Sequence, residues 1–224
     1  MKRNYVKVAF IGAMATVMVA TTTTPCNAGL FSKTQEQQLE KAHQKEYKER
    51  KKRFEKEGWK LSGNVHTLDV ALLEFYTKLN DKKSQNTQLV GQVSQCKSIN
   101  VCRQAAINNA ITSYASIAES AVKGKITSDL NADAIAPEAE FDKMYAAYVR
   151  NVKTEIKGQI TESFAVVKDK GDGNKEFEIY FIINEEQAAL ARKRAMERAL
   201  KETEMAQEYA RKIEEFVNVP VIPE

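Results

Sequence analysis

The chain has 224 residues, 43% hydrophobic and 29% charged, which fits one domain with helical extensions. Its formal charge of +4 includes Lys2, Arg3 and Lys7, which all lie in an N-terminal leader. The rest of the chain carries 31 basic and 30 acidic side chains and is nearly neutral. Because phosphate binding needs a clustered excess of positive charge, nucleic acid is excluded as the main partner.

Residues 1–28 have the pattern of a secretory signal peptide. Basic residues precede an apolar stretch at 8–20, which is too short to span a membrane, and small residues flank a cleavage point before Gly29. The alternative is a lipoprotein signal in which Cys26 receives lipid, although Pro25 fits that signal poorly. We expect an exported protein, in the periplasm or at the outer membrane or cell surface, with membrane contact only through such a lipid anchor.

Two helices are predicted before the first long strand. Residues 29–57 are almost wholly charged and polar, so their helix has a thin apolar stripe and should project from the core or lie along another helix. Gly58 should end it, and a short extended piece follows at Trp59. Thr67 is a candidate N-cap for an amphipathic helix that ends near Asn80.

The middle of the chain predicts a strand and a long apolar helix. Residues 87–93 form the strand, which Gly91 interrupts. Residues 101–123 place apolar side chains at helical spacing, and their many alanines would let the helix lie close to a sheet. Gly124 should end this helix, and we expect a further strand at 125–128.

The clearest strand pattern is a pair of alternating runs after a helix at 137–152. In residues 156–166 every second side chain is apolar or glycine apart from Glu162, and residues 177–183 repeat the alternation after a turn-rich segment at 169–174. The two runs predict half-buried strands paired as a β-hairpin. Because a lone hairpin is marginal in water, its apolar face should be buried under helices.

The last region, residues 185–224, predicts a long charged helix that Pro220 and Pro223 end. Its first half should pack on the domain, and its second half should run free or form a coiled coil with the N-terminal helix. The expected organisation is therefore a signal peptide (1–28), a charged helix (29–57), an α+β domain with an antiparallel sheet and a C-terminal hairpin (58–184), and a helical extension (185–224).

One resemblance to a known family follows from the order of these elements. It rests on Glu57-Gly58-Trp59-Lys60, Leu89-Val90-Gly91, the alanine-rich helix at 103–110, Gly124, Ile156-Lys157-Gly158 and the paired strands that end at Ile183. Over roughly residues 58–192 the chain resembles the LPP20-like family of bacterial envelope proteins, particularly secreted or lipid-anchored members from Bacteroidetes. The resemblance implies an α+β domain with helices packed on an antiparallel sheet, an envelope location, and no established catalytic residues.

Few residues are candidates for catalytic or metal chemistry. His43 and His66 have no partner at metal-ligand spacing, and no phosphate loop, nucleophile elbow or Ser/His/Asp pattern occurs. In the segment 169–174, glycines stand where a calcium loop needs oxygen ligands, which favours a plain hairpin turn. An active site would require Glu162 or Glu178 to have an acidic or basic neighbour in a pocket. We expect no enzyme activity, metal or cofactor.

Cys96 and Cys102 are the candidate disulfide. Their spacing differs from the Cys-x-x-Cys motif of redox enzymes. If one helix covered both, their Cα atoms would lie about 9 Å apart along its axis, beyond the limit of about 7 Å. Cys96 must therefore lie in the turn before the helix. In an oxidising compartment we expect a bridge that stabilises the fold by up to about 2 kcal/mol.

Two functions compete at this point. The first is a non-enzymatic envelope or surface protein that acts in assembly or protein binding, with the terminal helices as contact arms, which predicts self-association or a protein partner. The alternative is a periplasmic binding module for a polymer or small ligand, in a cleft between the hairpin and the helix at 141–152. In that cleft Tyr145, Tyr148 and Tyr180 would stack on the ligand, whereas the competing interpretation places their rings in the core.

Overall fold

The computed structural model describes residues 28–63, 66–129 and 138–203. The chain divides into two compact units, Met1–Leu39 and Glu40–Glu224. The described part of the first unit belongs to helix α1 (Ala28–Glu57), and the second unit holds the end of that helix and all other elements. The leader, Cys26 and residues 204–224 lie outside the described residues, so the signal peptide, the lipid anchor and the end of the last helix stay predictions.

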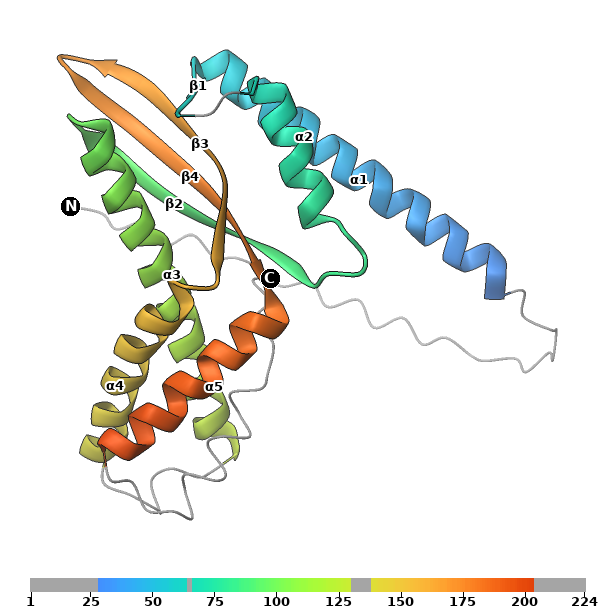
Figure 1. Ribbon diagram of the computed structural model, residues 1–224. Helices are drawn as coiled ribbons and strands as arrows, with labels where there is room; N and C mark the ends of the chain where they lie inside the picture. Colours follow the sequence, from blue (N-terminus) through green and yellow to red (C-terminus); the bar gives the residue numbers. More distant parts are fainter. Residues whose placement is uncertain (1–27, 64–65, 130–137, 204–224) are drawn as a thin grey trace, which may run out of the picture. The chain divides into compact units, whose positions relative to one another are not determined.

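Four strands form one antiparallel sheet in the order β1-β3-β4-β2 (Figure 1). Two of them, β3 and β4, are the predicted C-terminal hairpin, and its turn places Asp172 and Gly173 at positive φ, where glycine is unstrained. The α+β class with an antiparallel sheet is therefore confirmed. The strands are β1 (Lys60–Leu61), β2 (Asn86–Cys96), β3 (Ile160–Gly171) and β4 (Asn174–Asn184).

Helices cover both faces of this sheet, and each face has its own core. On one face, α3 (Ile99–Asp129), α4 (Glu138–Ile156) and α5 (Glu185–Glu202) pack many alanines against Phe177, Ile179 and Phe181. We call this the alanine face. On the other, α1 and α2 (Leu68–Leu79) pack rings, and we call this the aromatic face. Its buried residues are Phe54, Trp59, Ala71, Leu72, Phe75, Tyr76, Phe164, Val166, Tyr180 and Ile182.

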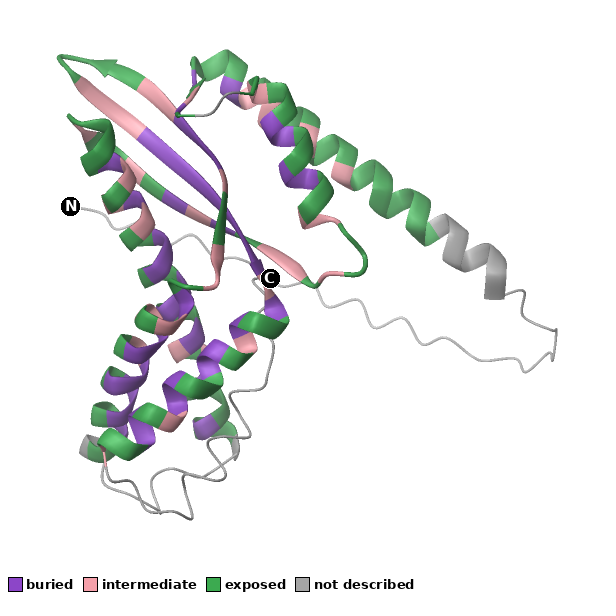
Figure 2. Cartoon of the chain, in the orientation of Figure 1, coloured by how far each residue is buried: buried purple, intermediate pink, exposed green. Residues whose placement is uncertain are grey.

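The central strand β4 is buried over most of its length, which Figure 2 shows in purple. Phe177 to Ile183 are all buried, because successive side chains enter the alanine face and the aromatic face in turn. The expectation of a half-buried strand is therefore wrong for β4. Tyr180 and Ile182, which would be solvent-facing in a one-sided sheet, lie under α1 and α2.

A β-bulge in β3 divides its side chains between the two faces. Glu162 is opposite Phe181, whereas Phe164 is opposite Tyr180, so one extra residue lies between the two pairs. Beyond the bulge Phe164 points into the aromatic face, while Phe181 lies in the alanine face. The prediction of one uninterrupted alternating face over 156–166 is therefore wrong, and its first residue, Ile156, instead ends α4.

Helix α3 continues beyond its predicted end. It passes through Gly124 and reaches Asp129, so the strand expected at 125–128 is absent from this described segment. Val122 and Ile126 are both buried and lie one helical turn apart, and their burial offsets the cost of about 1 kcal/mol for glycine in a helix.

Side-chain caps fix the starts of α2 and α5. The Thr67 hydroxyl accepts a hydrogen bond from the Val70 N–H, which confirms the predicted N-cap of α2. Asn184 caps α5 in the same way. Helix α5 buries a row of alanines over Ala188–Ala199 in the alanine face, which confirms that the first half of the predicted C-terminal helix packs on the domain.

Gly91 brings α3 against the sheet. A Cβ atom at this position would lie 2.0 Å from the Ala106 carbonyl oxygen and 3.1 Å from Ile179. The predicted close approach of an alanine-rich helix is confirmed, and the glycine marks the contact point inside a continuous strand.

Candidate functional site

The two cysteines of the described chain are at disulfide distance. Cys96 ends β2 and Cys102 lies in the first turn of α3, with their Cα atoms 5.5 Å apart. Cys102 is fully buried beneath the alanine face, whereas Cys96 is partly exposed. Cys96 lies before the helix, as the spacing required, but in the strand instead of the predicted turn, so the bridge joins the end of the edge strand to the helix that covers it.

The three tyrosines proposed as ligand contacts are core residues. Tyr145, Tyr148 and Tyr180 are 8%, 0% and 3% exposed. Tyr148 and Tyr145 belong to the alanine face, and Tyr180 stacks on Phe164 in the aromatic face at 4.5 Å between ring centroids. The predicted cleft in which these rings stack on a ligand is therefore wrong. The helical spacing of Tyr145 and Tyr148 reflects the packing of α4 against its neighbours.

The two glutamates considered for acid–base chemistry are held in ion pairs. Both carboxylate oxygens of Glu162 accept from Arg103 Nη1, at 2.5 and 2.7 Å. Glu178 accepts from Arg53 at 2.6 Å and from the Tyr180 hydroxyl at 2.5 Å. Burial and the adjacent Glu178 carboxylate raise the pKa of Tyr180 above its usual value, which keeps the phenol protonated as a donor. These contacts hold helices to the sheet.

A further buried ion pair, not predicted from the sequence, lies inside the alanine face. Arg192 is 1% exposed and donates to Glu185 at 2.7 Å and to the Tyr114 hydroxyl at 2.6 Å. Nearby, the hydroxyl of Tyr148 is buried and forms no hydrogen bond with a described residue. Burial raises the pKa of Tyr148. Because Arg192 looks like one more charge in a charged helix, only the alanine spacing around it hints at burial.

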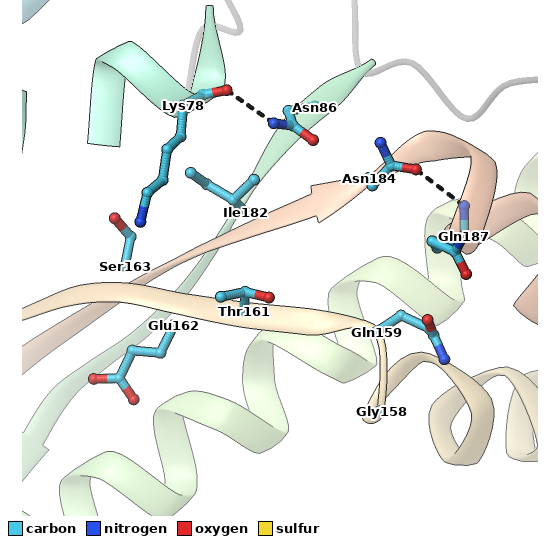
Figure 3. A pocket seen from close by; sticks show the side chains of 10 residues that line it. All are labelled: Lys78, Asn86, Gly158, Gln159, Thr161, Glu162, Ser163, Ile182, Asn184 and Gln187. Atoms are coloured by element: carbon cyan, nitrogen blue, oxygen red, sulfur yellow. Dashed lines mark hydrogen bonds between the residues drawn. The ribbon is translucent and has the colours of Figure 1, made fainter. Parts of the chain in front are cut away.

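A polar hollow of about 530 Å³ lies beside the start of β3 (Figure 3). The Lys78 ammonium points toward Ser163, and the Glu162 side chain leaves the opposite side of the strand. Most of its lining residues carry amides or hydroxyls, among them Asn86, Gln159, Thr161, Asn184 and Gln187. Such a lining, with Ile182 as its apolar side chain, offers hydrogen-bonding groups to a small polar ligand.

The outer edge of β2 is a second candidate site, because it presents backbone hydrogen-bonding groups. The Gln85 carbonyl accepts from the Glu185 N–H at 2.8 Å, so the odd-numbered residues of β2 face β4. Even-numbered residues therefore direct their N–H and C=O groups outward. The Asn109 amide confirms this direction, since it donates to the outward carbonyl of Gln92 at 2.8 Å.

Three residues make up the open part of this edge: Gln88, Val90 and Gln92. Apart from the Gln92 carbonyl, their outward backbone groups make no hydrogen bond with the part of the chain that the structure describes. Gln88 and Gln92 are exposed and Val90 is half-buried. An edge of this kind can accept an extended segment by β-strand addition.

The segment that forms β2 and most of α3 is nearly free of charge. From Ser84 to Ala118 only Lys97 and Arg103 are charged, two residues of 35, although 29% of the whole chain is charged. These residues include β2 and most of α3, which packs on it. Depletion of charge is typical of the centre of a protein interface. The sequence carried this signal, but it acquires meaning only when β2 is known to lie at an edge.

A shallow hollow of about 340 Å³ runs along the aromatic side of the same strand, between β2 and α1. Its floor includes Val90 and Gln92. The wall on the side of α1 carries two acidic residues followed by two basic residues along the chain: Glu46, Glu49, Arg50 and Arg53. The open edge therefore has an adjoining groove with both signs of charge.

The comparisons with known proteins add no assignment. No family model, curated protein or solved structure matches the chain. In residues 28–63, 66–129 and 138–203, no group of three or more metal-ligating side chains is found, and no helix is long and apolar enough to cross a membrane. The resemblance to the LPP20-like family stays a prediction.

Proposed function

We propose that this is a non-enzymatic exported protein that acts in assembly or protein binding, and that the edge of β2 is its binding surface. One observation supports this proposal most: Gln88, Val90 and Gln92 direct backbone donors and acceptors outward from an uncharged strand. Strand edges in monomeric proteins are commonly blunted by lysine, proline or a central bulge. Over these residues β2 has none of the three.

The opposite side of the sheet provides a contrast within the same molecule. β3 is open before its contact with β1, but a bulge lies in that stretch, and Lys168, Asp169 and Lys170 follow that contact. These features resist the addition of another strand. Binding through β2 therefore fits the distribution of charge and bulges better than binding through β3.

Site-specific photo-crosslinking tests this function. A photoreactive phenylalanine analogue replaces Gln88 in cells that produce the full chain, and a matched protein carries it at Lys170, which is exposed on the charged turn side of β3. We expect protein adducts from position 88 and none from position 170. A folded protein that gives no adduct at position 88 would contradict the proposal.

The hollow beside Lys78 supports a second candidate, a binding module for a small polar ligand. Its volume lies within the range of about 300–1,000 Å³ that is common for ligand sites. An anionic sugar such as glucuronate would satisfy the Lys78 ammonium and the surrounding amides. Chemical shifts at Thr161, Ser163 and Gln187 that saturate with glucuronate, and vanish in Lys78→Met, would support this role; unchanged spectra would remove it.

A further inference from the structure

We infer that the partner of the β2 edge is a second copy of this chain, paired antiparallel about a two-fold axis that passes beside Val90. This inference rests on the proposed function, because it names the occupant of the same surface. The two sheets would join into one, with a β2 strand from each copy at the junction. Such an interface is isologous, meaning that the same surface of each copy meets itself.

The backbone register of the edge fits this arrangement. A two-fold axis beside Val90 places this residue opposite its own copy, and it places Gln88 of each copy opposite Gln92 of the other. All three outward-facing residues then pair with one another, each through N–H and C=O groups, as hydrogen-bonded pairs of an antiparallel ladder require. The Gln92 carbonyl can accept this bond in addition to that from Asn109, because a carbonyl oxygen has two lone pairs.

The lack of charge in β2 favours an identical strand as the occupant. When a strand pairs with itself, a charged residue near the axis faces a like charge from the copy, which destabilises the pairing. β2 has no charged residue from Asn86 to Cys96. An acidic or basic target peptide would instead be expected to select a strand of opposite charge.

Helix α3 supplies further surface for this contact. Asn109 reaches the β2 edge, and the residues one and two turns along the same side of the helix are small, uncharged and exposed. They are Thr112, Ser113 and Ser116. Three strand residues bury far less than the roughly 800 Å² per partner of a stable interface, so the helix must contribute. Small side chains let two such helices approach closely across the axis.

The groove on the other side of β2 brings two paired arginines toward the two-fold axis. Arg50 bonds to Gln88 and Arg53 to Glu178, the neighbour of Gln92 on β4, so α1 runs in the same direction as β2. A two-fold axis reverses that direction in the second copy. Because Gln88 of each copy lies opposite Gln92 of the other, Arg50 of one copy then lies toward Arg53 of the other. Each arginine is already paired within its own chain, Arg50 with Glu46 and Arg53 with Glu178, which limits their repulsion.

A charge-reversal pair of variants tests the register. Both variants carry Gln92→Lys and differ only at the exposed Gln88, as Q88K/Q92K and Q88E/Q92K. In the first, lysine opposes lysine at two places across the axis; in the second, glutamate opposes lysine at both. We expect the dimer dissociation constant of Q88K/Q92K to rise on the order of tenfold or more relative to Q88E/Q92K. Sedimentation equilibrium of the disulfide-bonded full chain measures both constants, and circular dichroism verifies that each variant is folded.

The outcomes separate this inference from the proposed function. A wild-type dimer whose affinity falls in Q88K/Q92K and recovers in Q88E/Q92K supports the self-pairing. A wild type that stays monomeric at all concentrations, or two variants with equal dissociation constants, overturns it. If position 88 then crosslinks to a different protein, the binding function stands without self-pairing, and if it crosslinks to none, both proposals fail.

Discussion

The two faces of the sheet are packed by opposite means. On the alanine face, small side chains let α3 approach until Ala106 contacts Gly91, and close van der Waals contact stabilises the packing. On the aromatic face, α1 and α2 fill the space with rings in edge and stacked contacts, such as Phe164 on Tyr180. The first face should therefore be sensitive to added atoms and the second to removed atoms.

The largest effect is expected on the aromatic face. Phe164→Ala removes a fully buried ring that contacts Phe54, Phe75 and Tyr180, and we expect it to lower the free energy of unfolding by about 3–5 kcal/mol. Leu73→Ala is the control, because Leu73 is 58% exposed on the outer side of α2 and should change stability by about 0.5 kcal/mol or less. Chemical denaturation measures both, and equal losses would show that the rings do not form a core.

On the alanine face, adding one methyl group should be harmful. Gly91→Ala places a carbon 2.0 Å from the Ala106 carbonyl, which forces α3 away from the sheet and should cost about 1–3 kcal/mol. The matched control is Gly124→Ala on the same helix, where nothing lies within 4 Å and the helix should gain up to about 1 kcal/mol. The contrast disappears if Gly91→Ala is as stable as the wild type by thermal denaturation.

The disulfide joins the edge strand to the alanine face, and its loss should have an intermediate effect. The double variant Cys96→Ser/Cys102→Ser frees a short loop, and loop-closure entropy predicts a loss of about 2 kcal/mol. Urea denaturation is measured with and without reductant, for the wild type and for the double variant. Reduction should lower the wild type to the level of the variant and leave the variant unchanged; a wild type that does not respond to reduction would contradict the bridge.

The smallest effect should be a gain. The Tyr148 hydroxyl is buried in the alanine face without a hydrogen-bond partner among the described residues. Tyr148→Phe removes the cost of its desolvation and should raise the free energy of unfolding by about 1 kcal/mol. Calorimetry compares this variant with Tyr47→Phe, which removes a hydroxyl that donates to Asp69. A destabilised Tyr148→Phe would show that the Tyr148 hydroxyl has a partner.

The same variant has a pH signature. Burial raises the pKa of Tyr148 in the folded protein, so the unfolded chain loses the phenol proton first, near pH 10. The contribution of the protonated Tyr148 phenol to the free energy of unfolding is therefore fully present below pH 10 and falls as the pH rises further. Tyr148→Phe should lose less stability between pH 9 and pH 11 than the wild type, and equal losses would mean that the phenol titrates as in water.

The sequence predicted those parts of the fold that depend on local chemistry. The turn around Asp172, the N-cap Thr67 and the spacing of the two cysteines are each set by a few neighbouring residues. The bulge that sends Phe164 and Phe181 to opposite faces is a tertiary feature, because it depends on which strand lies opposite. Gly124 is similar: burial of Ile126 overrides the local preference for a helix end.

The candidate site was beyond sequence reasoning for a related reason. Tyr145, Tyr148 and Tyr180 have the composition of a ligand site, but whether they face a cleft or a core depends on α1 and α5, which the pattern had assigned to extensions. The charge-free run from Ser84 to Ala118 was visible, yet its value as a surface depends on the strand order, which no single segment encodes.

The central claim is that β2 is hydrogen-bonded on one side and open for a second copy on the other. Residue-resolved amide exchange across a dilution series tests it most directly. We predict slow exchange at Leu89 and Gly91 at every concentration, with exchange at Gln88 and Val90 that is fast in dilute solution and slow where the protein associates. Uniform protection of all four amides at high dilution, or fast exchange at Gln88 and Val90 at every concentration, would contradict it.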